Sequence, residues 1–256
     1  MDEQRIYGLN NEDEIINYLN RKVLRELNEK WRGIVLTMFP NAKDDDIIVV
    51  KHFPDKSAKP DMIVYINYEE KYVSIKTGYC PSMHQESFYS FLRFLRKLGV
   101  RYQDLEIIRF FHYGDSKKLK TGNNPLSLKE LKTRFSPYFL KVSKDLDQDR
   151  IIKRIIDRTV IRGTNPGRTA IDFLYYGDLE HGNIISREEI YEMILAYRNH
   201  DKTPIHFGGL VYMPNSRKVG RRERNFVRIK WPLLSFLYYR GKEDIEKMKK
   251  GTFVGS

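Results

Sequence analysis

The sequence predicts a mixed α/β fold, and three observations lead to this prediction. Apolar residues recur at helical spacing in two segments, over 15–27 and 88–98. Short runs rich in β-branched residues lie between turn residues from position 46 to position 77. These segments follow one another as helix, three strands, helix and strand within the first 112 residues, with a short extra helix after the first. A compact α/β core in this part of the chain is therefore expected.

Local patterns define each element of the core. Asn11 is suited to cap the first helix, and Gly99 is suited to end the last one. The second and third strands are separated by a four-residue turn, which predicts a β-hairpin. In order, we expect a helix after Asn11, a short helix over 31–39, strands over 46–53, 61–67 and 72–77, a helix over 83–98 and a strand over 105–112.

The rest of the chain has a different character. We expect helices over 128–135, 147–160, 187–198 and 233–250, and a strand-rich stretch over 206–231. Ser186 is suited to cap the third of these helices, with Glu188 and Glu189 in its first turn, where the helix dipole favours acids. The predicted organisation is a core over 1–115 and a basic, mixed α/β extension over 116–256 that serves recognition, dimerisation or both.

Composition narrows the classes of function. Lys and Arg number 46 against 34 Asp and Glu, a net charge of +12, which favours a polyanionic partner without choosing among DNA, RNA and a membrane surface. No apolar stretch is long enough to span a membrane and the N-terminus is polar, so we expect a cytoplasmic protein without a membrane partner. Cys80 is the single cysteine, which excludes an intrachain disulfide and a multi-cysteine zinc site.

Other chemistries are poorly supported. A phosphate-binding loop and a dinucleotide-binding glycine motif are both absent from the sequence. A zinc site built from Cys80 and His84 would have too few ligands. Cys80 as a nucleophile would lack a predicted His and acid beside it.

One pair of polar residues points to phosphodiester chemistry. Asp61 begins one strand of the hairpin and Lys76 lies near the end of the other, so the two are expected side by side at one rim of the sheet. An acid at such a rim can hold Mg²⁺, which prefers oxygen ligands. A lysine there can orient or activate water and offset developing charge. The alternative is that Asp61 merely opens a strand and Lys76 is a solvated strand end.

These residues carry a family resemblance. Pro60-Asp61 and Ser74-Ile75-Lys76, set in an αβββαβ order over roughly 10–112, resemble the PD-(D/E)XK nuclease superfamily, whose fold is that of restriction endonucleases. The resemblance implies that Asp61 is a metal ligand and Lys76 the catalytic lysine. It also implies that the backbone carbonyl of Ile75 lies near the metal, which would be Mg²⁺, with Mn²⁺ as a substitute.

The sequence departs from the family at Ser74, where an acid is usual. Some restriction endonucleases with Ser in this place take the missing acid from the following helix, and Glu86 is placed to be such a migrated acid. Gln85 and Tyr89 have a spacing similar to a supporting motif of RecB-type nucleases. As an exposed acid in the first turn of a helix, Glu86 would instead have only a structural role.

The first helix adds one more candidate. Such a helix often supplies a further carboxylate in this superfamily, and Glu14 is the expected residue, with Asp13 as its neighbouring alternative. The alternative is that Glu14 only closes a capping-box-like helix start, since it lies three residues after Asn11.

A basic segment in the extension is the expected DNA contact. Between two predicted strands it places positive charges that suit a phosphate backbone or a groove, although a solvated loop would look similar. The candidate DNA-binding residues are Arg217, Lys218, Arg221, Arg222, Arg224, Arg228 and Lys230.

The function expected from these features is Mg²⁺-dependent hydrolysis of double-stranded DNA, as in a type II restriction or phage-defence endonuclease. Cutting both strands favours a homodimer, and a methyltransferase or another defence component is a conceivable partner. One alternative is a nucleic-acid-binding protein that kept the fold and lost cleavage, because Ser74 replaces the acid. Another is a nuclease that acts on RNA or single strands.

Overall fold

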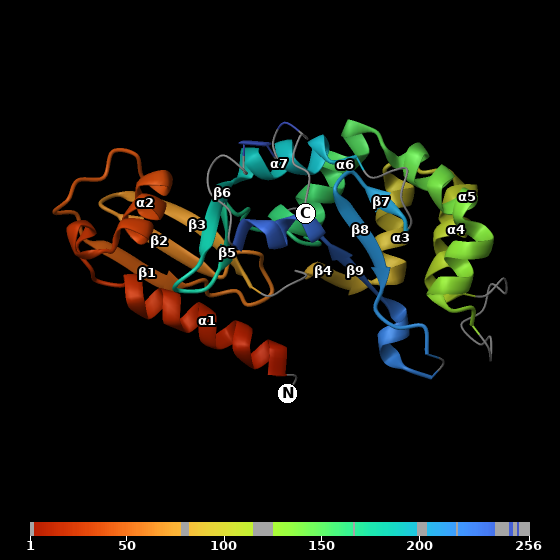
Figure 1. Cartoon of the computed structure of the whole chain (residues 1–256), viewed down its shortest axis with the longest axis horizontal. Helices are drawn as coiled ribbons and strands as arrows, with labels where there is room; N and C mark the ends of the chain where they lie inside the picture. The colour runs from red at the N-terminus through yellow and green to blue at the C-terminus, as the bar shows by residue number, and fades with distance from the viewer. Residues whose placement is uncertain are drawn as a thin grey trace. The chain divides into compact units, whose positions relative to one another are not determined.

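The computed structural model describes residues 3–77, 82–114, 125–165, 167–198, 204–218, 220–238, 246, 247 and 250 (Figure 1). The chain forms two compact units, and both are discontinuous in sequence. The first unit comprises Met1–Pro81, Ile161–Glu192 and Leu233–Ser256, and the second comprises Ser82–Val160 and Met193–Pro232. We expected a single boundary near residue 115, so the compact units do not follow the predicted division.

The first unit contains a mixed five-stranded sheet in the order β1-β2-β3-β5-β6. β1, β2 and β3 form an antiparallel meander, β3 pairs with β5 in parallel, and β5 and β6 form a hairpin. The predicted hairpin, which β2 and β3 form, is therefore confirmed. The strands are β1 (Ile48–His52), β2 (Met62–Ile66), β3 (Glu69–Lys76), β5 (Phe173–Gly177) and β6 (Gly182–Ser186).

Two helices pack on this sheet. α1 (Glu3–Leu19) and α2 (Glu29–Met38) share one hydrophobic core with β1, β2 and β3, to which a 3₁₀ turn at Leu24–Glu26 also contributes. The Asn28 side chain caps α2 by accepting a 2.9 Å hydrogen bond from the Trp31 amide. The predicted cap at Asn11 is wrong, because α1 begins eight residues earlier and Asn11 lies buried inside it.

The second unit contains an antiparallel four-stranded sheet in the order β4-β9-β8-β7. Helices α3, α4 and α5 follow one another and pack in sequence, α3 on α4 and α4 on α5. Its strands are β4 (Ser82–Ser87), β7 (His206–Phe207), β8 (Leu210–Pro214) and β9 (Phe226–Lys230). Its helices are α3 (Phe88–Lys97), α4 (Tyr102–Tyr113), α5 (Leu128–Leu146) and α6 (Asp149–Ile156), which a π-helical turn at Asp157–Ile161 continues.

Two predicted elements are wrong. The first five residues of the predicted helix over 83–98 belong to strand β4, because they pair with β9 far along the chain. The predicted strand over 105–112 is helix α4. Leu105, Ile108, Phe111 and His112 are buried at spacings of three and four, and Gly114 ends the helix in a left-handed conformation. The strand that pairs in parallel with β3 is β5, from the second half of the chain.

The remaining predictions for the extension have mixed outcomes. α7 (Arg187–Ala196) begins where predicted, with reciprocal hydrogen bonds between Ser186 and Glu189 at its start. A 3₁₀ helix at Pro232–Tyr238 stands where a final α-helix over 233–250 was expected, and much of that range lies outside the described residues. In the part of the chain that the structure describes, none of the helices has the length and apolar character that crossing a membrane requires.

Candidate functional site

Asp61 and Lys76 lie together at one rim of the first unit's sheet, as expected. Asp61 immediately precedes β2, and its amide donates to the carbonyl of Val73 on β3. Lys76 is the last residue of β3, and its Nζ lies 3.1 Å from Asp61 Oδ2. Both side chains are about one-fifth to one-quarter exposed, at 21% and 24%. The pair is therefore partly shielded by the protein while remaining open to a ligand.

Asp61 is held in place by three donors on β3. Its Oδ2 accepts hydrogen bonds from Ser74 Oγ at 2.9 Å, from the Ile75 amide at 2.6 Å and from Lys76 Nζ. Lys76 Nζ also donates to the Ile75 carbonyl at 2.7 Å, so its ammonium bridges two oxygens. Ser74 is buried, with 1% of its surface exposed. In this arrangement Ser74 fixes the orientation of the Asp61 carboxylate.

A third ionisable group of this site, Glu12 on α1, was missed by the sequence reasoning. Burial raises its pKa to about 7, the charge of Asp61 adds to the increase, and Lys76 opposes it. A signal was present, because Glu12 precedes the buried Ile15 and Ile16 by three and four residues, which places it on the inward face of the helix.

The predicted carboxylates of α1 face elsewhere. Glu14 and Asp13 are both exposed, and Asp13 Oδ1 lies 3.2 Å from Nε2 of the equally exposed His52. The partly buried acid in this part of α1 is therefore Glu12, and the role expected of Glu14 stays a prediction. The two side chains differ in helix phase, since a shift of two positions turns a side chain by about 200° around the axis.

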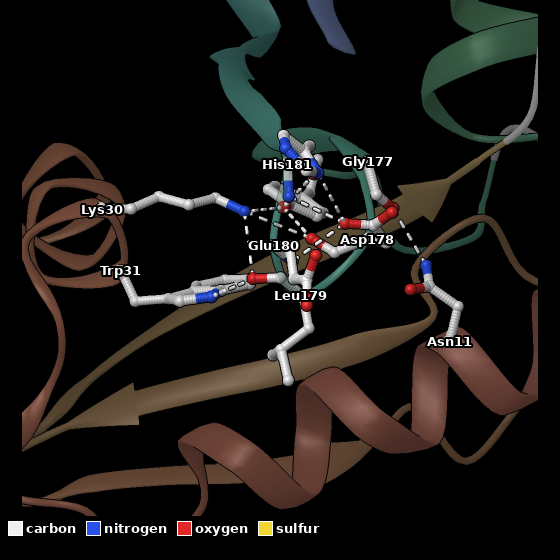
Figure 2. A network of polar contacts seen from close by, with 9 residues as sticks. Asn11, Lys30, Trp31, Gly177, Asp178, Leu179, Glu180 and His181 are labelled. Carbon is white, nitrogen blue, oxygen red and sulfur yellow. Dashed lines mark hydrogen bonds and ion pairs between the residues drawn. The ribbon is translucent and has the colours of Figure 1, made fainter. Parts of the chain in front are cut away.

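A buried hydrogen bond fixes α1 beside the strand that pairs with β3. Asn11 Nδ2 donates to the carbonyl of Gly177, the last residue of β5, at 2.9 Å (Figure 2). Gly177 adopts φ of 149°, and a Cβ there would lie 2.1 Å from the His181 carbonyl oxygen, so a larger residue would not fit. Since Asn11 immediately precedes Glu12, this bond also sets the position of the Glu12 backbone.

The turn between β5 and β6 is tied to α2 by a lysine. Lys30 Nζ donates to Tyr175 OH at 2.9 Å and to the carbonyls of Asp178 and Leu179 at 3.2 Å (Figure 2). Trp31 Nε1 donates to the same Leu179 carbonyl at 3.0 Å. Burial lowers the pKa of Lys30 to about 8, which the nearby Asp178 partly offsets. This network braces the hairpin on which the Asn11 bond depends.

Glu86 lies on strand β4 of the second unit, not at the start of a helix as expected. Arg158 binds both of its carboxylate oxygens, through Nε at 2.9 Å and Nη2 at 2.7 Å. Arg158 Nη2 also donates to Ser90 Oγ, and His84 Nε2 lies 3.2 Å from Glu86 Oε1. Burial alone would raise the pKa of Glu86, but the bonds from His84 and Arg158 outweigh it and hold the pKa at about 2.

The bidentate pairing gives Glu86 a structural partner for each oxygen, so its role as a metal ligand stays a prediction. Its predicted supporting neighbours lie on the same unit. Gln85 Oε1 accepts a 3.1 Å hydrogen bond from Arg228 Nε across the β4–β9 pair. Tyr89 is the second residue of α3 and is 39% exposed.

The candidate DNA-binding residues fall into two groups. Arg217 and Arg224 point into the second unit, where they donate to the carbonyls of Phe111 and Tyr113, and Lys230 is half-buried on β9. The others are exposed: Lys218, Arg221, Arg222 and Arg228.

The chemistry of the rim suits a hard cation. The described residues contain no cluster of three or more His, Cys, Asp or Glu side chains that could hold a metal, and Cys80 lies outside them. The oxygen donors at the rim are the carboxylate of Asp61 and the carbonyl of Ile75, and the carboxylate of Glu12 interacts electrostatically with Asp61 and Lys76. Mg²⁺ typically takes one or two carboxylates and completes its shell with water and substrate phosphate. This donor set fits that pattern, because the charge of Asp61 reinforces the effect of burial in raising the pKa of Glu12, and a bound cation would offset both.

Comparison with known proteins supports the fold. No family model matches the chain, and no curated protein matches it. Among solved structures, the crystal structure of restriction endonuclease MspI in complex with its cognate DNA is similar, with a TM-score of 0.58 and 13% sequence identity. The similarity covers 86% of this chain and 87% of that chain. The protein therefore has a mixed α/β fold of the restriction-endonuclease type.

Proposed function

We propose that the protein is a Mg²⁺-dependent endonuclease that hydrolyses phosphodiester bonds of double-stranded DNA. The observation that carries the proposal is the joint position of the Asp61 carboxylate, the Lys76 ammonium and the Ile75 carbonyl at one rim, with bonds of 3.1 Å and 2.7 Å linking them through Lys76 Nζ. Phosphoryl transfer needs positive charge near the phosphate oxygens and a positioned water, and this rim supplies groups for both.

Each side chain has a distinct part in the proposed reaction. Lys76 orients the attacking water and stabilises negative charge that develops on the phosphate. Asp61 and Glu12 would hold the metal ion together with the Ile75 carbonyl. When bound, Mg²⁺ supplies Lewis-acid stabilisation of the phosphate oxygens. Ser74 holds the Asp61 side chain in its orientation through the 2.9 Å hydrogen bond. Glu12 on α1 would supply the acid that the family usually has at the position of Ser74.

Glu12 is preferred over Glu86 as the second carboxylate on grounds of availability. The pKa of Glu12 is raised by its burial and by Asp61, so an added cation would relieve an unfavourable charge. Both oxygens of Glu86 already accept hydrogen bonds from Arg158, so a metal ion would compete with the arginine's positive charge at that carboxylate.

Plasmid cleavage tests the proposal. Wild-type protein with Mg²⁺ or Mn²⁺ should nick and linearise supercoiled DNA, and Lys76→Ala and Asp61→Ala should each lower the rate by at least about 100-fold. Lys71→Ala is the matched control, because Lys71 lies on the same strand, is similarly exposed at 30%, and pairs only loosely with Glu69 at 4.0 Å. Thermal melting of every variant separates lost chemistry from lost folding.

Duplex-DNA binding and cleavage of RNA and single strands, measured beside plasmid cleavage, decide among the alternatives. Binding of duplex DNA with no cleavage under any metal would favour an inactive nuclease-fold module, and cleavage confined to RNA or single strands would change the substrate class. A role in restriction or phage defence, a homodimer and a methyltransferase partner remain part of the proposal. Sedimentation of the protein with and without DNA tests the dimer.

A further inference from the structure

The connection between β8 and β9 is a basic segment of the second unit, which we call the basic arm and define by its described residues 215–218 and 220–225. Figure 1 shows it in blue, extending beyond the ends of the two strands that it joins. The arm includes a 3₁₀ turn at Arg222–Asn225, and the Asn215 amide donates to the Phe226 carbonyl at 2.9 Å where the arm begins and ends. The arm therefore begins and ends on two strands that are hydrogen-bonded to each other.

Two arginines fasten the arm to helix α4. Arg217 donates to the Phe111 carbonyl through Nη2 at 3.0 Å and Nε at 3.3 Å, and its guanidinium lies 5.0 Å from the centre of the Phe111 ring. Arg224, only 3% exposed, donates through Nη2 to the Tyr113 carbonyl at 3.2 Å. Burial lowers the pKa of Arg217 to about 10, so it stays charged at neutral pH. These two arginines are committed to holding the arm in place.

A buried histidine fixes the arm from the same side. His112 Nε2 lies 2.8 Å from the Arg224 carbonyl, and Nδ1 lies 2.7 Å from Tyr212 OH. Because a carbonyl can only accept, Nε2 carries the proton and Nδ1 accepts from the tyrosine. The ring stacks on Phe88 at 3.9 Å between centroids, and burial lowers its pKa to about 3. His112 is therefore neutral at physiological pH and serves as a fixed hydrogen-bond donor to the arm.

The outward side of the arm carries three exposed cations against one exposed acid, Glu223. Lys218, Arg221 and Arg222 are exposed, and none of them forms an ion pair with a described residue. Other exposed arginines differ: Arg25 pairs with Asp45, and Arg32 Nη2 lies 2.6 Å from Asp44 Oδ1. Unpaired cations on a rigid support are suited to an anionic surface, since less conformational entropy is lost when they bind.

We propose that the basic arm binds the phosphate backbone of duplex DNA through Lys218, Arg221 and Arg222, while Arg217 and Arg224 position the arm and do not touch DNA. The choice of DNA rests on the proposed function. The proposal divides the predicted DNA-binding residues of the arm into those that contact DNA and those that anchor the arm. Each phosphate neutralised by a cation releases counterions, so these contacts should appear in the salt dependence of binding.

The test is DNA binding by the double variant Arg221→Ala/Arg222→Ala in EDTA, where no metal-dependent cleavage can occur. We expect the slope of log K against log salt concentration to decrease in magnitude by about 1.8, since each lost phosphate contact removes about 0.9. The loss of affinity should be similar for unrelated duplex sequences. Arg25→Ala/Arg32→Ala is the matched control, because it removes the same charge from arginines that already have carboxylate partners; its slope should stay close to that of the wild type.

Three results would overturn the inference. An equal change of slope in the control would mean that only net charge matters. A loss confined to particular sequences would indicate base contacts instead of phosphate contacts. Absence of duplex binding by the wild type would show that duplex DNA is not the partner of the arm. Failure of the nuclease proposal would give a different result. The wild type would cleave no substrate, yet the arm variant would still show a smaller salt-dependence slope than the wild type. That result would support DNA binding by the arm and contradict the nuclease proposal.

Discussion

Replacing Glu86 by Gln gives a quantitative test of whether this buried acid is structural. Glu86 is 6% exposed, and Arg158 binds both of its oxygens. A carboxyl whose pKa falls from 4.5 to about 2 on folding stabilises the native state by about 3 kcal/mol at neutral pH, since each tenfold change in proton affinity is worth about 1.4 kcal/mol. Breaking a buried ion pair by removing one partner typically costs a comparable 3–5 kcal/mol.

The pH dependence of this loss follows from the direction of the pKa change. Because the pKa of Glu86 is lower in the folded state, its stabilisation is fully present above pH 4.5 and disappears as the pH falls toward 2. The difference in unfolding free energy between wild type and Glu86→Gln should therefore be about 3 kcal/mol at pH 7. It should shrink to about 1 kcal/mol at pH 3.

Thermal and urea unfolding of the two proteins measure this difference. We expect Tm to fall by about 6–12 °C at pH 7. Glu106→Gln is the control, because Glu106 pairs with Arg109 in the same unit but is 28% exposed, so its loss should cost under about 1 kcal/mol. A Glu86→Gln protein as stable as this control would refute the reasoning. If it also needed more Mg²⁺ for cleavage, Glu86 would be the migrated ligand that the sequence predicted.

Three further predictions concern the first unit. Ser74→Ala should slow cleavage by about 10- to 100-fold with little change in KM, because a hydrogen bond to the Asp61 carboxylate is worth about 1.5–3 kcal/mol; single-turnover kinetics measures this. Glu12→Gln should be more stable than the wild type at pH 8 in EDTA and equally stable at pH 4, because a pKa raised to about 7 makes ionisation of Glu12 unfavourable to the fold. The wild type should gain stability relative to Lys30→Met as the pH rises from 8 to 10, because the pKa of Lys30 is about 8 in the fold and 10.5 ordinarily; melting curves across this range test it.

The hairpin and its polar rim could be predicted from sequence because both depend on local order. Two β-branched runs separated by a short turn must place the start of one strand beside the end of the other, and in the structure Asn67 and Tyr68 form that turn. That constraint alone brings Asp61 within reach of Lys76. Helix periodicity also predicts that Glu12 lies on the inward face of α1. Glu12 was missed because the helix was expected to start at Asn11, which would place Glu12 in the first turn.

The errors arose where distant pairing decided the structure. Residues 82–87 form a strand because β9, about 140 positions later, supplies their hydrogen-bond partners, and a helical pattern in the following residues concealed this. The run over 105–112 is rich in apolar residues, as either a buried strand or a buried helix would be. In the structure its buried positions recur at spacings of three and four, as in a helix. Short apolar runs do not distinguish a strand from a buried helix by themselves.

The parallel pairing of β3 with β5 has a consequence for synthesis of the chain. Tyr72 exchanges two hydrogen bonds with Asp172, exactly one hundred positions later, and the following residues of β3 pair in register with β5. A growing chain must therefore extend past residue 177 before the strand that carries Lys76 has neighbours on both sides. Until then β3 exposes an open edge, which is prone to pairing with other chains. A fragment ending at residue 115 would keep that edge permanently, so chaperone contact during translation should concentrate on nascent chains between these two lengths.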